Sequence, residues 1–225
     1  MEFDPEGEDK IIAGMLYSAQ NNTASWTDTL LVVSNMPMDQ KKRVINAYIQ
    51  GREARWQKVG RAFENTYVRF EIVSNFGAWK DIQRHRMLTN QRQSFTTTLG
   101  YDIPPEVIES GLEAEFRAAL DPVADLHQSI AKHSPELAQY AVTHAHRVRY
   151  MQWENLRQSF WQTELRSIPE GHPDYRRIAQ EKFKLLEQVY PLLAEHMLVN
   201  MGEYDFARRG QEEKIQRKLK QVSFV

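Results

Sequence analysis

The chain has 225 residues, of which 41% are hydrophobic and 26% are charged, and its formal net charge is −1. These fractions lie close to globular averages, so they exclude a disordered or fibrous protein and allow one sizeable core. A nearly neutral chain also argues against bulk affinity for nucleic acid, although local clusters of basic residues favour small anionic ligands. No apolar run has membrane-spanning length, and the acidic N-terminus lacks an apolar signal core, so we expect a cytoplasmic protein that does not bind membranes.

The sequence contains no cysteine. Disulfides, thiolate zinc sites and thiol nucleophiles are therefore excluded. His144 and His146 stand two residues apart, but a metal site would need a third ligand of which the sequence shows no sign. We predict no metal site, and we interpret the two imidazoles as solvated or hydrogen-bonded groups.

The N-terminal part, residues 1–58, is predicted to be mainly helical. Apolar residues at helical spacing indicate helices over 9–20, 28–34 and 39–49. Asp39 is expected to cap the third of these helices. The segment 51–60 is rich in Arg, Lys and Gln, and we interpret it as a solvated connection.

The middle of the chain alternates between apolar and polar residues over 67–73 and 142–153, which predicts two half-buried strands. A helix is predicted shortly after each strand, over 78–91 and 155–166. Further helices are expected over 106–133, where one or two are predicted, from Ser134-Pro135 onward, and up to about His196.

These elements predict an α+β fold, with long helices around a small, mainly antiparallel sheet. The absence of repeats and low-complexity linkers makes a single domain over 1–225 the simplest organisation. Residues 208–225 are expected to form a charged amphipathic tail.

Arg84-His85-Arg86 is followed, after seven residues, by Ser94. Two guanidiniums beside an imidazole form a dense set of hydrogen-bond donors, which suits phosphates and planar, electron-rich rings. The alternative is a solvated, charged helix face that pairs with Asp81 or Glu71.

A second window begins with Asn155 and Arg157, at the start of a predicted helix, and continues to Arg166 nine residues later. A guanidinium stays cationic at any relevant pH and offers paired donors to a ring edge. Either arginine alone would be interpreted as a surface charge, with Arg166 favoured near a helix carboxyl end. The combination favours a ligand site.

The Arg-His-Arg-x7-Ser spacing, together with the second window, resembles the flavin-dependent thymidylate synthases over roughly residues 59–197. The resemblance implies that FAD is bound by Arg84, His85, Arg86, Thr89, Asn155, Arg157 and His172. It also implies that Ser94 and Arg166 lie at the nucleotide, with Arg166 as the catalytic residue that favours the ionised pyrimidine. Ser94 would lie beside the ring without needing to attack it.

The implied reaction is the methylation of dUMP to dTMP, with methylenetetrahydrofolate as the carbon donor and NADPH as the reductant of FAD. The implied assembly is a homotetramer in which subunits share each active site. The lack of cysteine agrees with this reaction, because ordinary thymidylate synthases attack the pyrimidine with a cysteine.

Several positions depart from the family pattern. Thr96 and Gln139 replace arginines that bind the nucleotide phosphate, and Arg92 replaces a carboxylate. Asp81 replaces a glutamine, and Val59 replaces a histidine near the flavin. Arg92 is the expected substitute for the lost phosphate contacts. Besides an active synthase, two alternatives stay open: a non-catalytic relative that forms half of a larger assembly, and a flavoprotein with a different substrate.

Overall fold

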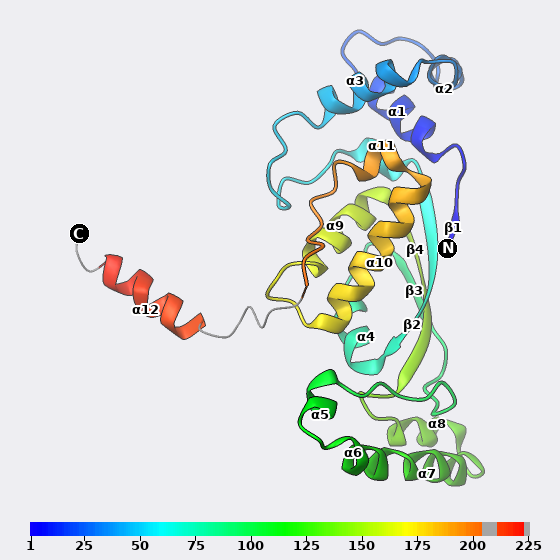
Figure 1. Ribbon diagram of the computed structural model, residues 1–225. Helices are drawn as coiled ribbons and strands as arrows, with labels where there is room; N and C mark the ends of the chain where they lie inside the picture. The colour runs from blue at the N-terminus through cyan, green and yellow to red at the C-terminus, as the bar shows by residue number, and fades with distance from the viewer. Residues whose placement is uncertain (204–210, 223–225) are drawn as a thin grey trace.

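A computed structural model describes residues 1–203 and 211–222 of the chain. The described chain is elongated, with a helical group at one end, a sheet with its helices in the middle, and a helical arm at the other end (Figure 1). The predicted α+β class is confirmed. None of the helices in this part of the chain is both long and apolar enough to cross a bilayer.

The N-terminal group confirms the three predicted helices. They are α1 (Gly7–Tyr17), α2 (Trp26–Ser34) and α3 (Met38–Tyr48). The predicted cap of α3 is wrong: Pro37 occupies the cap position, and Asp39 lies inside the first turn, where its carboxylate accepts from Arg43 at 2.7 Å.

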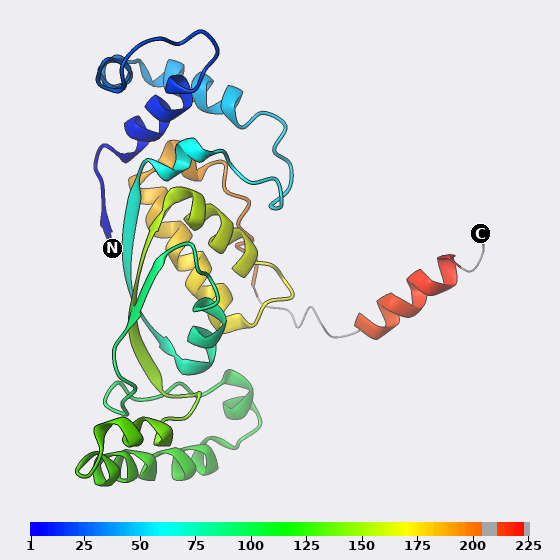
Figure 2. The ribbon, with the colours of Figure 1, turned by 180° about the vertical axis from the view of Figure 1, so that it is seen from behind.

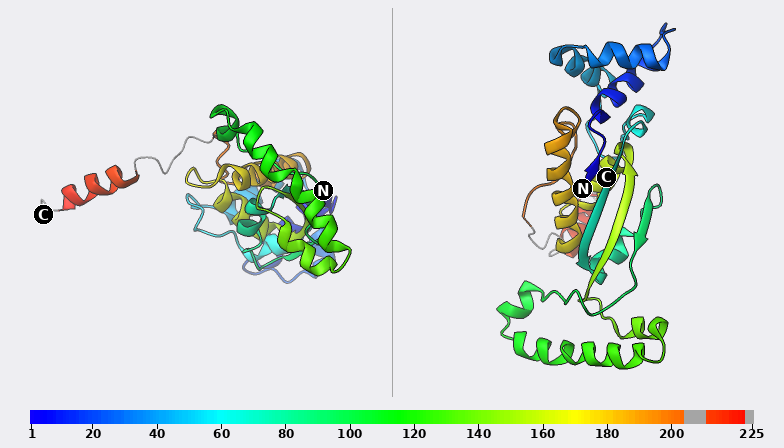
Figure 3. Two further views of the ribbon diagram at one scale, coloured as in Figure 1. Left: turned by 90° about the horizontal axis from the view of Figure 1, so that it is seen from below. Right: turned by 90° about the vertical axis from the view of Figure 1, so that its right-hand side faces the viewer.

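The sheet is antiparallel, and its order within the described chain is β1-β2-β4-β3. Its strands are β1 (Glu2–Phe3), β2 (Tyr67–Asn75), β3 (Thr89–Arg92) and β4 (Arg147–Asn155). The alternation seen in the sequence sends one set of side chains toward helices α4 (Phe76–Ile82), α9 (Leu156–Arg166) and α10 (Pro173–Val189). In the right-hand view of Figure 3, these helices lie on one side of the sheet only.

Two asparagines turn strands directly into helices. Asn75 ends β2, and its Oδ1 accepts from the backbone of Ala78 at 2.8 Å. Asn155 ends β4, and its Oδ1 accepts from the backbone of Gln158 at 2.9 Å. Because β2 and β4 are antiparallel and pair along their full length, the two caps lie at opposite ends of the ladder.

The helix predicted over 78–91 is wrong in its second half. The helix α4 begins directly at Phe76 and ends at Ile82, and Thr89–Arg92 forms the edge strand β3 against β4. The Arg84-His85-Arg86 motif therefore lies in the loop that joins α4 to β3, not on a helix. The strand predicted from residue 142 also begins later, at Arg147.

The arm is divided more finely than predicted. It contains α5 (Pro105–Glu109), α6 (Glu113–Leu120), α7 (Pro122–Ala131), α8 (Pro135–Ala138) and the 3-10 turn η2 (Gln139–Ala141). Gly111, at φ +73°, and Pro122 separate the first three helices. No residue between 104 and 137 is buried, so the arm has no core of its own. Figure 2 shows it beyond the end of the sheet.

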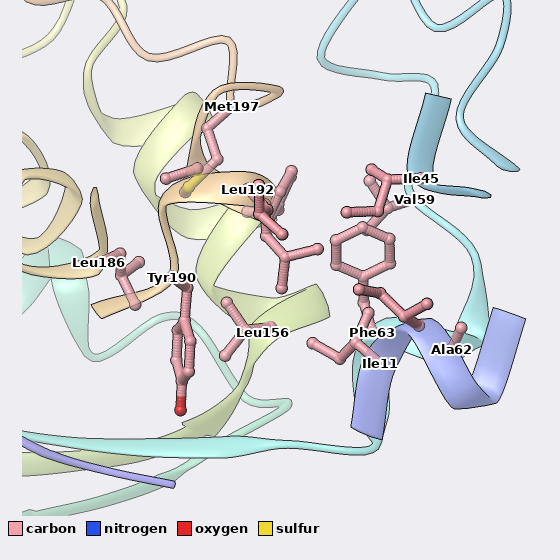
Figure 4. Close-up of a cluster of buried hydrophobic side chains, with 14 of the residues drawn as sticks. Ile11, Ile45, Val59, Ala62, Phe63, Leu156, Leu186, Tyr190, Leu192 and Met197 are labelled. Carbon is pink, nitrogen blue, oxygen red and sulfur yellow. The ribbon is translucent and has the colours of Figure 1, made fainter. Parts of the chain in front are cut away.

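The main core lies where the N-terminal helices meet the turn η1 (Arg61–Glu64), α9, α10 and α11 (Pro191–Ala194). Figure 4 shows side chains of this core, including Phe63. The ring of Phe63 lies 4.9 Å from that of Phe160, between centroids. The long helix predicted to reach His196 ends at Val189, because Pro191 cannot continue it.

The predicted charged tail covers 208–225. Residues 208–210 and 223–225 lie outside the described residues. Between them the chain forms the helix α12 (Gln211–Val222).

Candidate functional site

The two sequence windows meet in one cavity of about 400 Å³. The loop after α4 contributes Arg84, His85 and Arg86 to its wall. Helix α9 and its cap contribute Asn155, Arg157 and Arg166 from the other side. The structure thus brings together six of the residues that the sequence assigned to cofactor and substrate.

Arg166 is held in place on three sides. Its Nε donates to His85 Nε2 at 2.9 Å, and its Nη2 donates to the carbonyl oxygen of Asp81 at 2.6 Å. Its Cζ lies 5.2 Å from the ring centroid of Tyr175, within the range of a cation–π contact. The side chain is 15% exposed, so these contacts fix a guanidinium that still reaches the cavity.

His85 is a neutral imidazole in this arrangement. Burial, with smaller contributions from the charges of Arg166 and Lys182, lowers its pKa from 6.5 to about 3. Since Nε2 accepts from Arg166, the ring proton belongs on Nδ1. The Gln158 amide nitrogen lies 3.3 Å from Nδ1, so the amide accepts this proton once it is turned to present Oε1 to the ring.

Half of the residues of the connection 51–60 are exposed, as predicted for a solvated segment, but the connection also forms another wall of the cavity. Arg52 is nearly buried, pairs with Glu164 and donates to the carbonyl oxygen of His196 at 3.0 Å. These contacts anchor a segment that has no regular secondary structure. Arg55 and Lys58 of this segment also line the cavity.

The cations around the cavity fall into two groups. Arg157 is neutralised by Glu64, with 2.9 Å between Nη1 and Oε1. By contrast, Arg55 and Arg86 make no hydrogen bond or ion pair with any described residue. The Nζ of Lys58 lies 4.5 Å from the ring centroid of Trp161. Arg55 lies near enough to Glu164 for its charge to act on the pKa of that carboxyl, whereas Lys58 and Arg86 form no ion pair with any described residue. The cavity therefore presents positive charge that is only partly neutralised, a feature suited to an anionic ligand.

A buried ion pair, Lys182 with Glu154, lies among β4, α9 and α10. Lys182 Nζ contacts Glu154 Oε1 at 2.7 Å and Gln152 Oε1 at 3.1 Å, and it also donates to Gln162. Burial lowers the pKa of Lys182, and the Glu154 carboxylate opposes that shift. This network ties β4 to α9 and α10, the elements that carry Asn155 and Arg166.

Three residues that were predicted to bind the nucleotide or the cofactor lie outside the cavity: Thr89, Arg92 and Ser94. Arg92 ends β3, with its Cζ 3.9 Å from the ring centroid of Phe95 and its Nη1 3.4 Å from Gln139 Oε1. Ser94 is exposed, and Thr89, which was assigned to the cofactor, pairs with Trp153 at the exposed strand edge. None of these residues lines the cavity.

His172 is also separated from the cavity within one chain. It caps α10, where its Nδ1 accepts from the backbone of Asp174 at 3.3 Å. It lines a second cavity of about 960 Å³, together with Asn75, Asp102 and Arg147. The structure therefore gives it no contact with the residues assigned to flavin.

The described residues contain no group of three side chains suited to holding a metal ion. His144 Nε2 lies 3.3 Å from Lys80 Nζ, whereas His146 Nδ1 accepts from the backbone of Thr143 at 3.2 Å. The two imidazoles thus have separate hydrogen-bond partners.

Comparison with known proteins gives a family match over most of the chain. The model of a family described as "Thymidylate synthase complementing protein" matches residues 3–192. A UPF0159 protein of Chlamydia muridarum is 36% identical over 210 residues, which cover 93% of this chain and 39% of that protein. The UPF0159 protein Ta1429 of Thermoplasma acidophilum is 30% identical over 206 residues, covering 90% and 41%. The chain therefore spans about two fifths of the length of these relatives.

Proposed function

Because the chain belongs to the thymidylate synthase complementing protein family, we propose that it is a flavin-dependent thymidylate synthase-type methyltransferase. The proposed reaction methylates dUMP to dTMP, with methylenetetrahydrofolate as the carbon donor and NADPH as the reductant. One observation carries the proposal: Arg84, His85 and Arg86 share a cavity with Asn155, Arg157 and Arg166.

The side chains around this cavity fit FAD. Its diphosphate needs positive charge that is not already neutralised, and Lys58 and Arg86 offer it. Pockets for drug-sized ligands span about 300–1,000 Å³, so a cavity of about 400 Å³ would hold only part of a dinucleotide. The remainder would lie across the rim, where Arg84 is exposed.

Arg166 is the proposed catalytic residue. Two of its five N–H groups are used by His85 and Asp81, which leaves three to donate to a pyrimidine edge. A guanidinium at that edge stabilises negative charge on the ring and so favours the ionised, nucleophilic pyrimidine. Bound FAD would supply the hydride that reduces the transferred carbon.

We propose that Arg92 and Ser94 complete the nucleotide site of another copy of the chain. Both lie outside the cavity in their own chain, so a site that uses all of these residues needs a homo-oligomer. A tetramer with shared active sites is the proposed assembly. In this arrangement Arg92, which already contacts Gln139, supplies the positive charge that Gln139 and Thr96 lack.

The test begins with the purified chain and FAD. Saturable quenching of flavin fluorescence is expected, followed by NADPH oxidation that depends on both dUMP and methylenetetrahydrofolate. The absence of saturable FAD binding would contradict the flavoenzyme proposal as a whole.

A second candidate is a relative that has lost the reaction or changed its substrate and acts as half of a larger assembly. Two observations favour it: the two phosphate-binding arginines are missing at Thr96 and Gln139, and the chain spans about two fifths of its relatives. Calorimetry with dUMP on the FAD-loaded protein separates the candidates. Binding of FAD without binding of dUMP would support the second.

A further inference from the structure

We infer that His85 is a positioning residue that aims Arg166 into the cavity, and that it does not bind flavin directly. This inference rests on the proposed function, since it concerns how Arg166 meets the pyrimidine. It also revises the direct contact with FAD that was predicted for His85, the centre of the Arg-His-Arg motif.

The two nitrogens of His85 are both occupied by protein. Nε2 accepts from Arg166 at 2.9 Å, and Nδ1 lies 3.3 Å from the amide of Gln158. The residue is only 8% exposed. No ring nitrogen is therefore left to hydrogen-bond a cofactor, whereas its neighbours Arg84 and Arg86 are exposed at the rim.

His85 Nε2 and the Asp81 carboxylate compete as acceptors for the Arg166 guanidinium. Asp81 Oδ1 lies 3.9 Å from Arg166 Nη1 and 3.4 Å from Arg84 Nη1. If the contact with His85 were lost, the strongest remaining partner for the Arg166 guanidinium would be this carboxylate. The guanidinium would then turn from the pyrimidine toward Asp81.

A neutral imidazole is suited to this task. An imidazolium has no lone pair to accept from Arg166 and would repel it. The groups that act on His85 are Arg166 and Gln158 on α9 and Lys182 on α10, whereas the Asp81 carboxylate on α4 lies beside Arg166. The two cations among them, together with burial, keep the ring neutral by lowering its pKa.

The closing experiment compares two amide substitutions at this position. The amide of His85→Gln falls near the place of Nε2 and can accept from Arg166, whereas the shorter amide of His85→Asn falls near Nδ1 and cannot. Both variants stay polar beside Gln158, so they differ mainly in the contact under test. His133→Gln, at an exposed position in the arm, serves as the unrelated control.

Two ligand affinities are measured for each variant. We expect His85→Asn to weaken dUMP binding roughly 10- to 100-fold, because a hydrogen bond to a charged group is lost. His85→Gln should recover most of that loss, and FAD affinity should change less than about threefold in either variant. Loss of FAD affinity in both variants, with no difference between them for dUMP, would overturn the inference.

A third measurement needs no ligand. Solvent exchange of the Arg166 Nε–H, followed by NMR, should be slow in the wild type and in His85→Gln but fast in His85→Asn. If the wild type bound neither FAD nor dUMP, the proposed function would fail, while this exchange pattern would still test the positioning contact. Equal exchange in all three proteins would overturn it. If His85→Asn does not fold, Gln158→Leu, which frees the imidazole on its other side, should speed the same exchange, and slow exchange in that variant would also overturn it.

Discussion

The cavity and the strand edge carry the two halves of the proposed site, and they differ in how their side chains are held. In the cavity, Arg166, Arg157 and Arg52 each have a partner that fixes the guanidinium. At the edge, Ser94 is exposed, and Arg92 lies on the ring of Phe95 with a long contact to Gln139.

This difference distinguishes the part of the proposed site that one chain forms by itself from the part that it would contribute to a second copy. Residues held by buried partners are already in a binding geometry, so their ligand need not reorganise them. At the edge, Arg92 also donates to the carbonyl oxygen of Gln93 at 2.9 Å, but Arg92 and Ser94 stay exposed to solvent and so remain available to a ligand or a second chain. The comparison predicts that changes in the cavity affect stability, the cofactor and, through Arg166, the pyrimidine ring, whereas changes at the edge affect nucleotide binding and the assembly without affecting the cofactor.

The largest effect is expected for the buried pair behind the cavity. Lys182→Met leaves the Glu154 carboxylate buried without a cation, which should lower the free energy of unfolding by about 3–5 kcal/mol. Urea denaturation provides the measurement. Lys184→Ala, which removes the exposed partner of Glu181, is the matched control and should cost less than about 1 kcal/mol. Equal decreases in the free energy of unfolding for the two variants would contradict a larger stabilisation by the buried pair.

The second-largest effect is expected from acid, which should lower the folding stability through His85 in the cavity. The pKa of His85 is about 3 in the folded chain against an ordinary 6.5, so between these pH values only the unfolded chain takes up the proton. Stability therefore falls as the pH drops through this window, by at most roughly 1.4 kcal/mol per pH unit. Denaturation at pH 7 and pH 4.5 should show a smaller difference for His85→Gln than for wild type. Identical differences would mean that His85 does not titrate in this way.

The rim cation Arg86 should matter for the cofactor alone. Arg86→Ala is expected to weaken FAD binding about tenfold or more, through loss of a charge-assisted contact, without changing the midpoint of urea unfolding. Arg43→Ala, at an exposed salt bridge on α3, is the control and should leave FAD affinity unchanged. Comparable FAD affinities for the two variants would count against the proposed diphosphate grip.

The smallest effect is expected at the edge. Arg92→Ala should weaken dUMP binding severalfold and leave FAD affinity unchanged, because Arg92 lies outside the cavity of its own chain. Tight dUMP binding that ignores the substitution would contradict the compensation for Thr96 and Gln139. Light scattering should also give a multiple of the 26.4 kDa chain mass, whereas a monomer that binds dUMP normally would contradict the shared site.

The sequence predicted those features that depend on local pattern. The alternation in 67–73 located β2, and the apolar spacing located the N-terminal helices. It failed for 83–92, because the edge strand there exists through its pairing with β4, more than fifty residues later in the chain. A polar strand at a sheet edge shows little periodicity of its own.

The candidate site was predictable in part for the same reason. Arg84 and Arg166 were identified through a recognisable spacing, and the structure places both at the same cavity. The contributions of Arg55 and Lys58 were missed, because their segment lacks regular secondary structure and its basic residues resemble a solvated loop. The pairing of Arg52 with Glu164 depends on a contact between distant segments, which no local pattern reveals.

The connection 51–60, which Arg52 anchors, affects how fast a ligand can bind. Fixing a loose backbone costs roughly 1–2 kcal/mol per residue in lost conformational entropy. Because Arg52 binds Glu164 and His196, this backbone is ordered when the chain folds. Arg55 and Lys58 are therefore positioned at the cavity before an anion binds. Association at this wall would then be limited by diffusion and charge attraction instead of by the ordering of a loop.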